Sequence, residues 1–191
     1  FLMAYGGGAA KLADAFGLSI SKAKSLIAKY YKNFSSLAEY FSKVGQDAKE
    51  KGYILIDDVI GRKSFIEGYK DYVRDGEHLD KFNYDAHPYV EKRYRMVSGK
   101  IQRDAQNRPI QGTSANISKR AGVLLQKERE KAGINFKILL LIHDEWVLEC
   151  AESDSEVVAK LLAEVMEPAS SYYLKHITIP ADAKISRQWL K

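Results

Sequence analysis

Three adjacent residues, His143, Asp144 and Glu145, have side chains that could hold a metal ion or orient a reacting group. They separate two short apolar runs, residues 139–142 and 146–148, and each run has the length of a buried strand. Because burying an unpaired carboxylate is costly, we expect the three residues to form the tight turn of a hairpin at a sheet edge. Carboxylates on such a rigid support suit a hard divalent cation such as Mg²⁺. The same pattern also fits an acidic turn that only faces solvent.

The segments around this turn predict the elements that would hold it in place. Residues 113–132 have apolar side chains at helical spacing and stop at Gly133, so they predict an amphipathic helix before the hairpin. Residues 153–156 read Ser-Asp-Ser-Glu, the pattern of a capping box, and predict a further helix that ends near Pro168. We expect residues 177–185 to form a last strand that joins the sheet of the hairpin.

The first half of the chain predicts short helices that end at glycines. Residues 1–16 have the pattern of a helix tail that stops at Gly17. The elements expected next are a helix capped by Ser19 or Ser21, a helix that begins after Ser35 or Ser36 and ends at Gly52, and a short strand from Tyr53 to Ile60.

The middle of the chain has a weaker pattern. We expect a solvated loop at residues 69–74, where charged and aromatic side chains interleave, with a DNA-facing patch as the alternative. The whole segment 64–90 shows no clear period. Its two histidines, His78 and His87, lack further ligands at metal-binding spacing, so surface histidines are expected. From Val90 to Arg103 the chain is basic, which is typical of a solvated face and also suits a surface that follows phosphates.

Composition agrees with a folded domain that handles nucleic acid, without proving it. Hydrophobic residues make up 46% of the 191 residues and charged residues 29%, which is ordinary for a globular chain. The net charge of +5 is mildly favourable for a polyanionic partner. Cys150 is the only cysteine, which excludes an internal disulfide and favours a reducing compartment. No apolar run approaches the roughly 20 residues of a membrane span, so we expect a cytoplasmic protein without a membrane partner.

Four segments carry motifs in a fixed order along the chain. Residues 1–13 contain F-x-x-x-Y-G followed by L-A, and residues 52–63 contain G-Y followed by G-R-K. Residues 107–116 read N-x-P-x-Q-G-T-x-A-N, and residues 142–149 read I-H-D-E-W-V-L-E. Together with Trp189 near the end, these segments resemble the fingers and palm of the family A, or polymerase I-like, DNA polymerases.

The resemblance implies an α+β fold, in which a helical fingers segment precedes part of the antiparallel palm sheet of a right-hand polymerase. It implies the C-terminal part of the fingers at residues 1–98 and the C-terminal part of the palm at residues 99–191. The family's D-Y-S-Q-x-E-x-R motif, which supplies the other metal-binding carboxylate, is not found in this sequence, and neither is a thumb. We therefore expect a fold that is incomplete on its own and inactive as an isolated chain. A second polypeptide, or a missing N-terminal portion, would supply the thumb, the first palm motif and the start of the fingers helix.

The activity that the resemblance implies is template-directed nucleotidyl transfer in DNA replication. Primer–template DNA and a deoxynucleoside triphosphate are the implied partners. The implied cofactors are two Mg²⁺ ions, shared with the missing motif. Asp144 is the expected metal ligand and catalytic carboxylate, and Glu145 is expected to be a peripheral ligand. His143 would orient the primer terminus.

Five further residues match family positions that contact nucleotide or DNA. Phe1 and Tyr5 match positions against the incoming nucleotide and the templating base. A phenylalanine at position 1 predicts discrimination against dideoxynucleotides, which a Phe1→Tyr change should relax. Arg103, Asn107 and Gln111 match positions that contact the primer–template. Gln111 suits the minor groove, where A·T and G·C pairs share acceptor positions and an amide donor can test pairing without reading sequence.

Two other functions are open from the sequence. A polymerase remnant that binds DNA or a replication partner without catalysis would keep the fold, but a binding role has no need of the paired carboxylates Asp144 and Glu145. An unrelated metal-dependent phosphodiesterase would need further Asp, Glu or His ligands nearby, and the sequence does not supply them.

Overall fold

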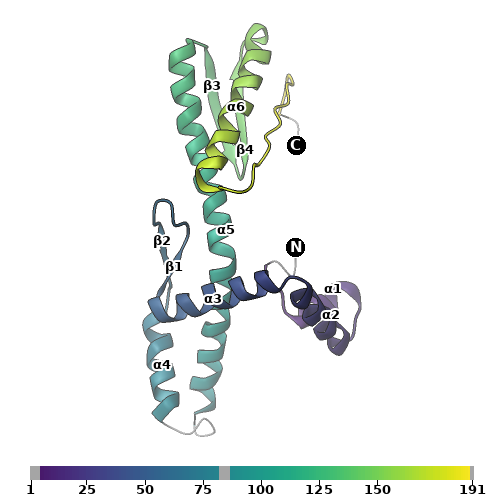
Figure 1. The fold of residues 1–191 in the computed structure, drawn as a ribbon, viewed down its shortest axis with the longest axis vertical. Coiled ribbons are helices and arrows are strands. Elements are labelled where there is room, and N and C mark those ends of the chain that lie inside the picture. The colour runs from purple at the N-terminus through teal and green to yellow at the C-terminus, as the bar shows by residue number, and fades with distance from the viewer. Residues whose placement is uncertain (1–4, 82–86, 190–191) are drawn as a thin grey trace. The chain divides into compact units, whose positions relative to one another are not determined.

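The computed structural model describes residues 5–81 and 87–189, which form helices and two small antiparallel sheets (Figure 1). Contacts divide the chain into two compact units, residues 1–110 and 111–191. The first unit holds α1 (Ala9–Phe16), α2 (Ile20–Asn33), α3 (Ser35–Lys51), β1 (Tyr53–Leu55), β2 (Lys63–Phe65) and α4 (Tyr69–Lys81). Helix α5 (Pro88–Ala132) contributes to both units, and the second adds β3 (Phe136–Ile142), β4 (Glu145–Cys150) and α6 (Ser155–Tyr173). The predicted α+β class is confirmed.

The helix ends of the first unit follow the predicted local signals. Helix α1 ends at Gly17, whose φ of 60° is left-handed, and α3 ends at Gly52 in the same way. The hydroxyl of Ser19 accepts a hydrogen bond from the Lys22 N–H at 3.2 Å and caps α2. The predicted helix over residues 1–16 is wrong for residues 5–8, because α1 begins only after Gly8. Residues 1–4, including Phe1, lie outside the described part of the chain.

Helix α3 packs closely against α5 in the first unit. A Cβ atom at Gly45 of α3 would collide with the side-chain amide of Gln102 of α5, so a larger residue there would require the Gln102 side chain to move. Gln102 uses its Nε2 to donate a hydrogen bond to the Phe41 carbonyl at 2.7 Å. The core beside this contact consists of Ala48, Ile54, Tyr72, Ile101 and Ala105.

The loop expected at residues 69–74 is wrong, because these residues belong to α4. Helix α4 buries Tyr72 and Leu79, and Tyr72 stacks on Tyr94 of α5 with ring centroids 4.9 Å apart. Asp75 of α4 is also buried and accepts two hydrogen bonds from Arg93 of α5, at 2.6 and 2.5 Å. Tyr69, Tyr72 and Val73 stand at helical spacing, so the sequence did carry a signal for α4, which the charged residues between them obscured.

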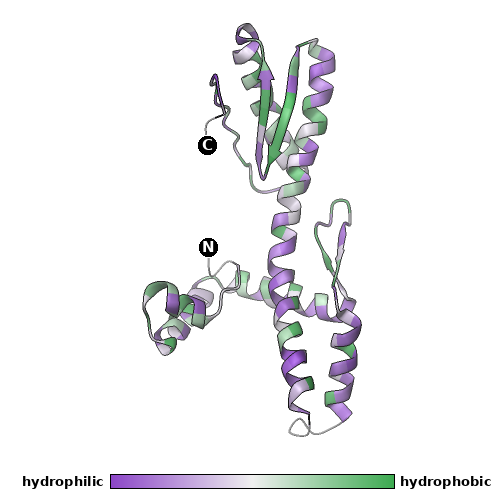
Figure 2. Cartoon of the chain, turned by 180° about the vertical axis from the view of Figure 1, so that it is seen from behind, coloured by the Kyte–Doolittle hydropathy of each residue, from purple (hydrophilic) through white to green (hydrophobic). Residues whose placement is uncertain are grey.

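The second unit packs the β3–β4 hairpin against α5 and α6 (Figure 1). Its buried core consists of Leu125 of α5, Phe136 of β3, and Val158 and Val165 of α6. Strand β3 is hydrophobic along much of its length (Figure 2). Its central residues are nevertheless exposed: Leu139 to 48%, Leu140 to 44% and Leu141 to 40%. Within the described residues, no helix is long and apolar enough to span a membrane.

Four predictions about the helices and strands in the second half of the chain are wrong. Helix α5 does not start at residue 113 but runs through Pro109, and α6 runs through Pro168 to Tyr173. The capping box is not formed, because a 3₁₀ turn (Glu152–Asp154) precedes α6 and its N-cap, Asp154, makes no side-chain cap bond. The predicted strand at residues 177–185 is irregular, and the sheet of the second unit, as far as the chain is described, pairs β3 with β4 alone.

Candidate active site at the β3–β4 hairpin

The turn between β3 and β4 has the predicted hairpin geometry. Ile142 pairs with Glu145, so His143 and Asp144 form a two-residue loop. His143 has a φ of 56°, the only positive φ of a non-glycine residue in the described chain. Histidine is among the residues that tolerate this conformation, which is otherwise uncommon. The backbone therefore turns at His143 and presents Asp144 at the tip of the hairpin.

The two carboxylates of the turn have different surroundings. Both are exposed, but Glu145 Oε1 accepts a hydrogen bond from the indole Nε1 of Trp189 at 3.0 Å. For Asp144, the described part of the chain provides no hydrogen bond and no ion pair. Asp144 is thus open to accept a ligand at both oxygens, whereas one oxygen of Glu145 is already engaged.

Trp146, the residue after the turn's last carboxylate, anchors the hairpin on α5. Its ring lies against Gly122, where an added Cβ would stand 2.6 Å from the ring atom Cζ2. The Trp146 indole nitrogen is buried and has no hydrogen-bond partner in the described residues. The sequence analysis missed this contact. Its only signal in the sequence is Gly122, a glycine inside a predicted helix, which can mark a place where a large side chain packs closely.

The donor set of the hairpin fits part of a Mg²⁺ site. Mg²⁺ commonly takes one or two protein carboxylates together with waters and substrate phosphates, so an all-protein cage is not required. Asp144 supplies such a carboxylate, and Glu145 supplies a second with one free oxygen. The described residues contain no cluster of three or more His, Cys, Asp or Glu side chains that could hold a metal by itself.

Three predicted DNA- or nucleotide-contacting residues lie in the first unit, and the structure brings them together. Asn107 of α5 donates a hydrogen bond from Nδ2 to the Tyr5 carbonyl at 3.4 Å. Gly6, with a φ of 71°, approaches α5 so closely that an added Cβ would stand 2.5 Å from Gln106 Oε1 and 3.5 Å from Cγ of Arg103. The Tyr5 side chain is 45% exposed. Gln111 is exposed on α5 and belongs to the second unit.

Sequence reasoning also missed two polar residues of α5. Arg108 pairs with Asp104 at 2.7 Å and donates to the Ser64 hydroxyl at 2.8 Å, so it ties β2 to the helix. Gln106 is buried beside Gly6, and its Oε1 has no hydrogen-bond partner among the described residues. Arg108 lies in the motif at residues 107–116 and Gln106 directly before it, and residue type alone does not separate side chains that face DNA from those that pack.

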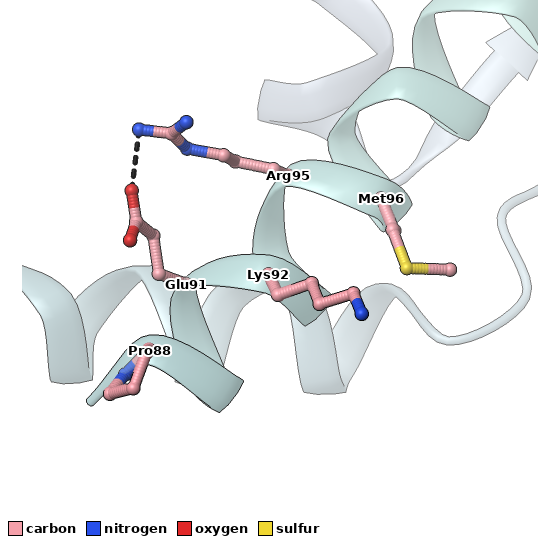
Figure 3. A pocket seen from close by; sticks show the side chains of 5 residues that line it. All are labelled: Pro88, Glu91, Lys92, Arg95 and Met96. Carbon is pink, nitrogen blue, oxygen red and sulfur yellow. Dashed lines mark ion pairs between the residues drawn. The ribbon is translucent and has the colours of Figure 1, made fainter.

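A pocket of about 380 Å³ lies at the start of α5, apart from these residues. It is lined by Pro88, Glu91, Lys92, Arg95 and Met96, and Glu91 pairs with Arg95 at 2.5 Å (Figure 3). All five residues come from one helix, and Arg95 and Met96 are largely exposed, so the pocket is a surface depression.

Comparison with known proteins places the chain in a family. The family model for DNA polymerase family A matches residues 1–191. DNA polymerase I of Aquifex aeolicus is 28% identical over 182 residues, which cover 95% of this chain and 26% of that protein. The thermostable DNA polymerase I of Thermus aquaticus is 27% identical over 190 residues, 100% of this chain and 20% of that protein.

A solved structure is similar as well. It is the POL domain of Pol1 from M. smegmatis in complex with DNA primer-template and dNTP, with 29% sequence identity and a TM-score of 0.68. The match covers 88% of this chain and 26% of that chain. The present chain thus spans about a quarter of the length of this domain and of the Aquifex polymerase, and a fifth of the Thermus enzyme. Because the family model matches every residue, the chain belongs to DNA polymerase family A.

Proposed function

We propose that this chain is the C-terminal portion of a template-directed DNA polymerase and that its β3–β4 hairpin supplies the palm carboxylates. The observation that carries the proposal is Asp144, an exposed carboxylate without a partner in the described residues, at the tip of a two-residue turn. Membership of the family and the likeness to a polymerase domain with primer-template and dNTP support the same activity.

In the proposed reaction, the primer 3′-hydroxyl gives up its proton to water and its oxygen bonds to the α-phosphorus of the triphosphate. The bond from that phosphorus to the pyrophosphate oxygen breaks, and pyrophosphate leaves. Two bound Mg²⁺ ions would lower the pKa of the attacking hydroxyl and neutralise charge on the leaving pyrophosphate. Asp144 would hold them together with the carboxylate of the missing motif. Glu145 would be a peripheral ligand, because Trp189 engages one of its oxygens. His143 would orient the primer terminus beside the turn.

The remaining predicted residues would position the substrates. Tyr5 would contact the templating base, and Phe1, which lies outside the described residues, the incoming nucleotide. The Tyr5 carbonyl is held by Asn107. Arg103, Asn107 and Gln111 would contact the primer–template from α5. We assign residues 1–98 to the fingers and 99–191 to the palm, as the resemblance to the family implies. The division by contacts falls later along α5, at residues 110 and 111.

We further propose that activity requires the thumb, the first palm motif and the start of the fingers helix, from a second polypeptide or from an N-terminal portion. The exposed apolar residues of β3 support this, because a free apolar strand edge is costly in water and is ordinarily covered. The free thiol of Cys150 is compatible with a cytoplasmic location.

The test is primer extension with Mg²⁺, using the chain alone and mixed with a polypeptide that carries the missing motifs. We expect extension only in the mixture, and its loss, by roughly a hundredfold or more, on Asp144→Ala. The matched control is Asp182→Ala, which removes another exposed aspartate of the same unit and should leave extension unchanged. A folded mixture that binds primer–template but does not extend it would instead indicate the non-catalytic remnant.

A further inference from the structure

The two histidines of the first unit meet where α4 ends and α5 begins. His78 lies in the last turn of α4, and His87 directly precedes α5, where its carbonyl accepts a hydrogen bond from the Glu91 N–H at 3.1 Å. The two ring centroids are 4.5 Å apart, and the ring planes make an angle of 74°. The sequence predicts ordinary surface histidines here, but both residues are only partly exposed. The fold therefore brings two imidazoles together at one end of a helix pair.

The helices that carry the two histidines are fixed to each other. Figure 1 shows α4 and the first part of α5 running side by side. Asp75 of α4 accepts hydrogen bonds from Arg93 of α5 at 2.6 and 2.5 Å. The rings of Tyr72 and Tyr94 stack across the same helix pair. Imidazoles on such a frame are held near each other before a ligand binds, which lowers the entropic cost of binding.

The spacing of the two rings fits a pair of ligands on one metal ion. Imidazole nitrogen binds Zn²⁺ at about 2.0–2.1 Å, so two rings on one ion have centroids about 4.5–5.2 Å apart for bond angles of about 90–110°. The distance of 4.5 Å between His78 and His87 lies at the lower end of this range. The χ2 torsion of histidine has a broad profile, so a rotation of either ring can aim both nitrogens at a shared ion.

The donor set selects the kind of ion. Imidazole suits Zn²⁺, Cu²⁺ and Ni²⁺, whereas Mg²⁺ and Ca²⁺ prefer oxygen ligands. Asp75, one turn before His78, is engaged by Arg93 through both oxygens, so it is a neighbour of the pair and not a third ligand. The described residues contain no group of three metal-ligating side chains. Water would therefore complete the coordination, as it does in open zinc sites.

We propose that His78 and His87 bind one divalent transition-metal ion of the zinc class, which links the end of α4 to the start of α5. The proposal goes beyond the proposed polymerase function and does not depend on it. The ion bridges two elements that are adjacent only in the folded chain, so its binding stabilises the folded state. Mg²⁺, the ion expected at Asp144, does not compete for this pair, because it prefers oxygen ligands.

The experiment measures the binding of Zn²⁺ alone to the 191-residue chain. In isothermal titration calorimetry, His78→Gln and His87→Gln should each bind one Zn²⁺ fewer than the parent, because glutamine keeps the polarity of the side chain but is a poor zinc ligand. The matched control is His176→Gln, which removes an exposed histidine of the second unit and should bind as the parent does. Free Zn²⁺ at about 100 times its Kd should shift the unfolding equilibrium of the parent about a hundredfold towards the folded state. Excess EDTA should reverse this shift, and both variants should lack it.

Nuclear magnetic resonance of the parent identifies the ligands without any substitution. The chain has four histidines, and Zn²⁺ should change the imidazole Cε1–H signals of His78 and His87 and leave that of His176 unchanged. Unchanged signals of the pair, equal changes at all four histidines, or equal Zn²⁺ binding by the parent and both variants would overturn the proposal. Asp144→Ala should bind Zn²⁺ at the pair as the parent does, so failure of this site and failure of primer extension are separate results.

Discussion

At the scale of single residues, the turn separates two carboxylates that are adjacent in sequence. The positive φ of His143 places Asp144 in the loop, whereas Glu145 already belongs to β4 and reaches Trp189. Successive residues of a strand point to opposite faces, so the two acids do not share one direction. This separation is the physical reason for proposing different roles for Asp144 and Glu145.

The buried pair of Asp75 and Arg93 gives a prediction about pH. The hydrogen bonds from Arg93 hold the pKa of the Asp75 carboxyl below its ordinary value, against the opposite effect of burial. Because the pKa of Asp75 is lower in the folded than in the unfolded protein, its ionised form stabilises the fold in full at pH values above the unfolded pKa of about 3.9. This stabilisation is lost as the pH falls from there through the folded pKa.

We therefore expect Asp75→Asn to lower the urea midpoint clearly at pH 7 and much less near pH 3. Urea unfolding followed by circular dichroism at both pH values measures this. Asp71→Asn is the control on the same helix, because Asp71 pairs only with the exposed Arg74. An equal loss at both pH values would contradict the assigned role of the charge.

At the scale of elements, local signals predicted where helices end but not where they continue. Gly17, Gly52 and Gly133 all adopt a positive φ directly after a helix, and each was readable from the sequence because the signal is a single residue. Pro109 and Pro168 lie inside helices, although an interior proline costs a hydrogen bond. Contacts distant in sequence decide such cases, and a local pattern does not contain them.

The contact between α5 and the hairpin gives the second prediction. Gly122→Ala places a Cβ against the Trp146 ring and should lower the free energy of unfolding by about 1–3 kcal/mol through overpacking. Trp146→Leu in the same chain should recover most of that loss, because the smaller side chain frees the space. A double-mutant cycle by chemical denaturation measures the coupling. If the changes in the free energy of unfolding simply add, the Trp146 ring does not pack against Gly122 in the way described.

At the scale of the molecule, the site was only partly readable from the sequence. His143, Asp144 and Glu145 are consecutive, so their turn could be predicted from a short pattern. The bond between Asn107 and the Tyr5 carbonyl joins residues 102 positions apart, and the Arg108 bond to Ser64 joins residues 44 apart. Such contacts depend on how helices pack, and composition or spacing does not reveal them.

The exposed strand β3 gives the third prediction, for the chain as a whole. Leu139 and Leu141 are 48% and 40% exposed and lie in a free apolar strand, so the isolated chain should self-associate. Changing both to Lys should reduce association in analytical ultracentrifugation by severalfold while the helical circular dichroism signal is unchanged. The same change should block activation by the complementary polypeptide. A parent chain that stays monomeric at high concentration would contradict the prediction.

The bond between Trp189 and Glu145 gives the hairpin an optical reporter. The chain has two tryptophans, and both touch the hairpin: Trp146 follows its turn, and Trp189 donates to its carboxylate. Tryptophan fluorescence of the chain therefore reports on this region alone, and no added label is needed. An ion or nucleotide that competes for Glu145 Oε1 breaks the bond from the Trp189 indole, which is already 48% exposed, and changes its emission. Titration of the unmodified chain can thus be followed at the turn itself.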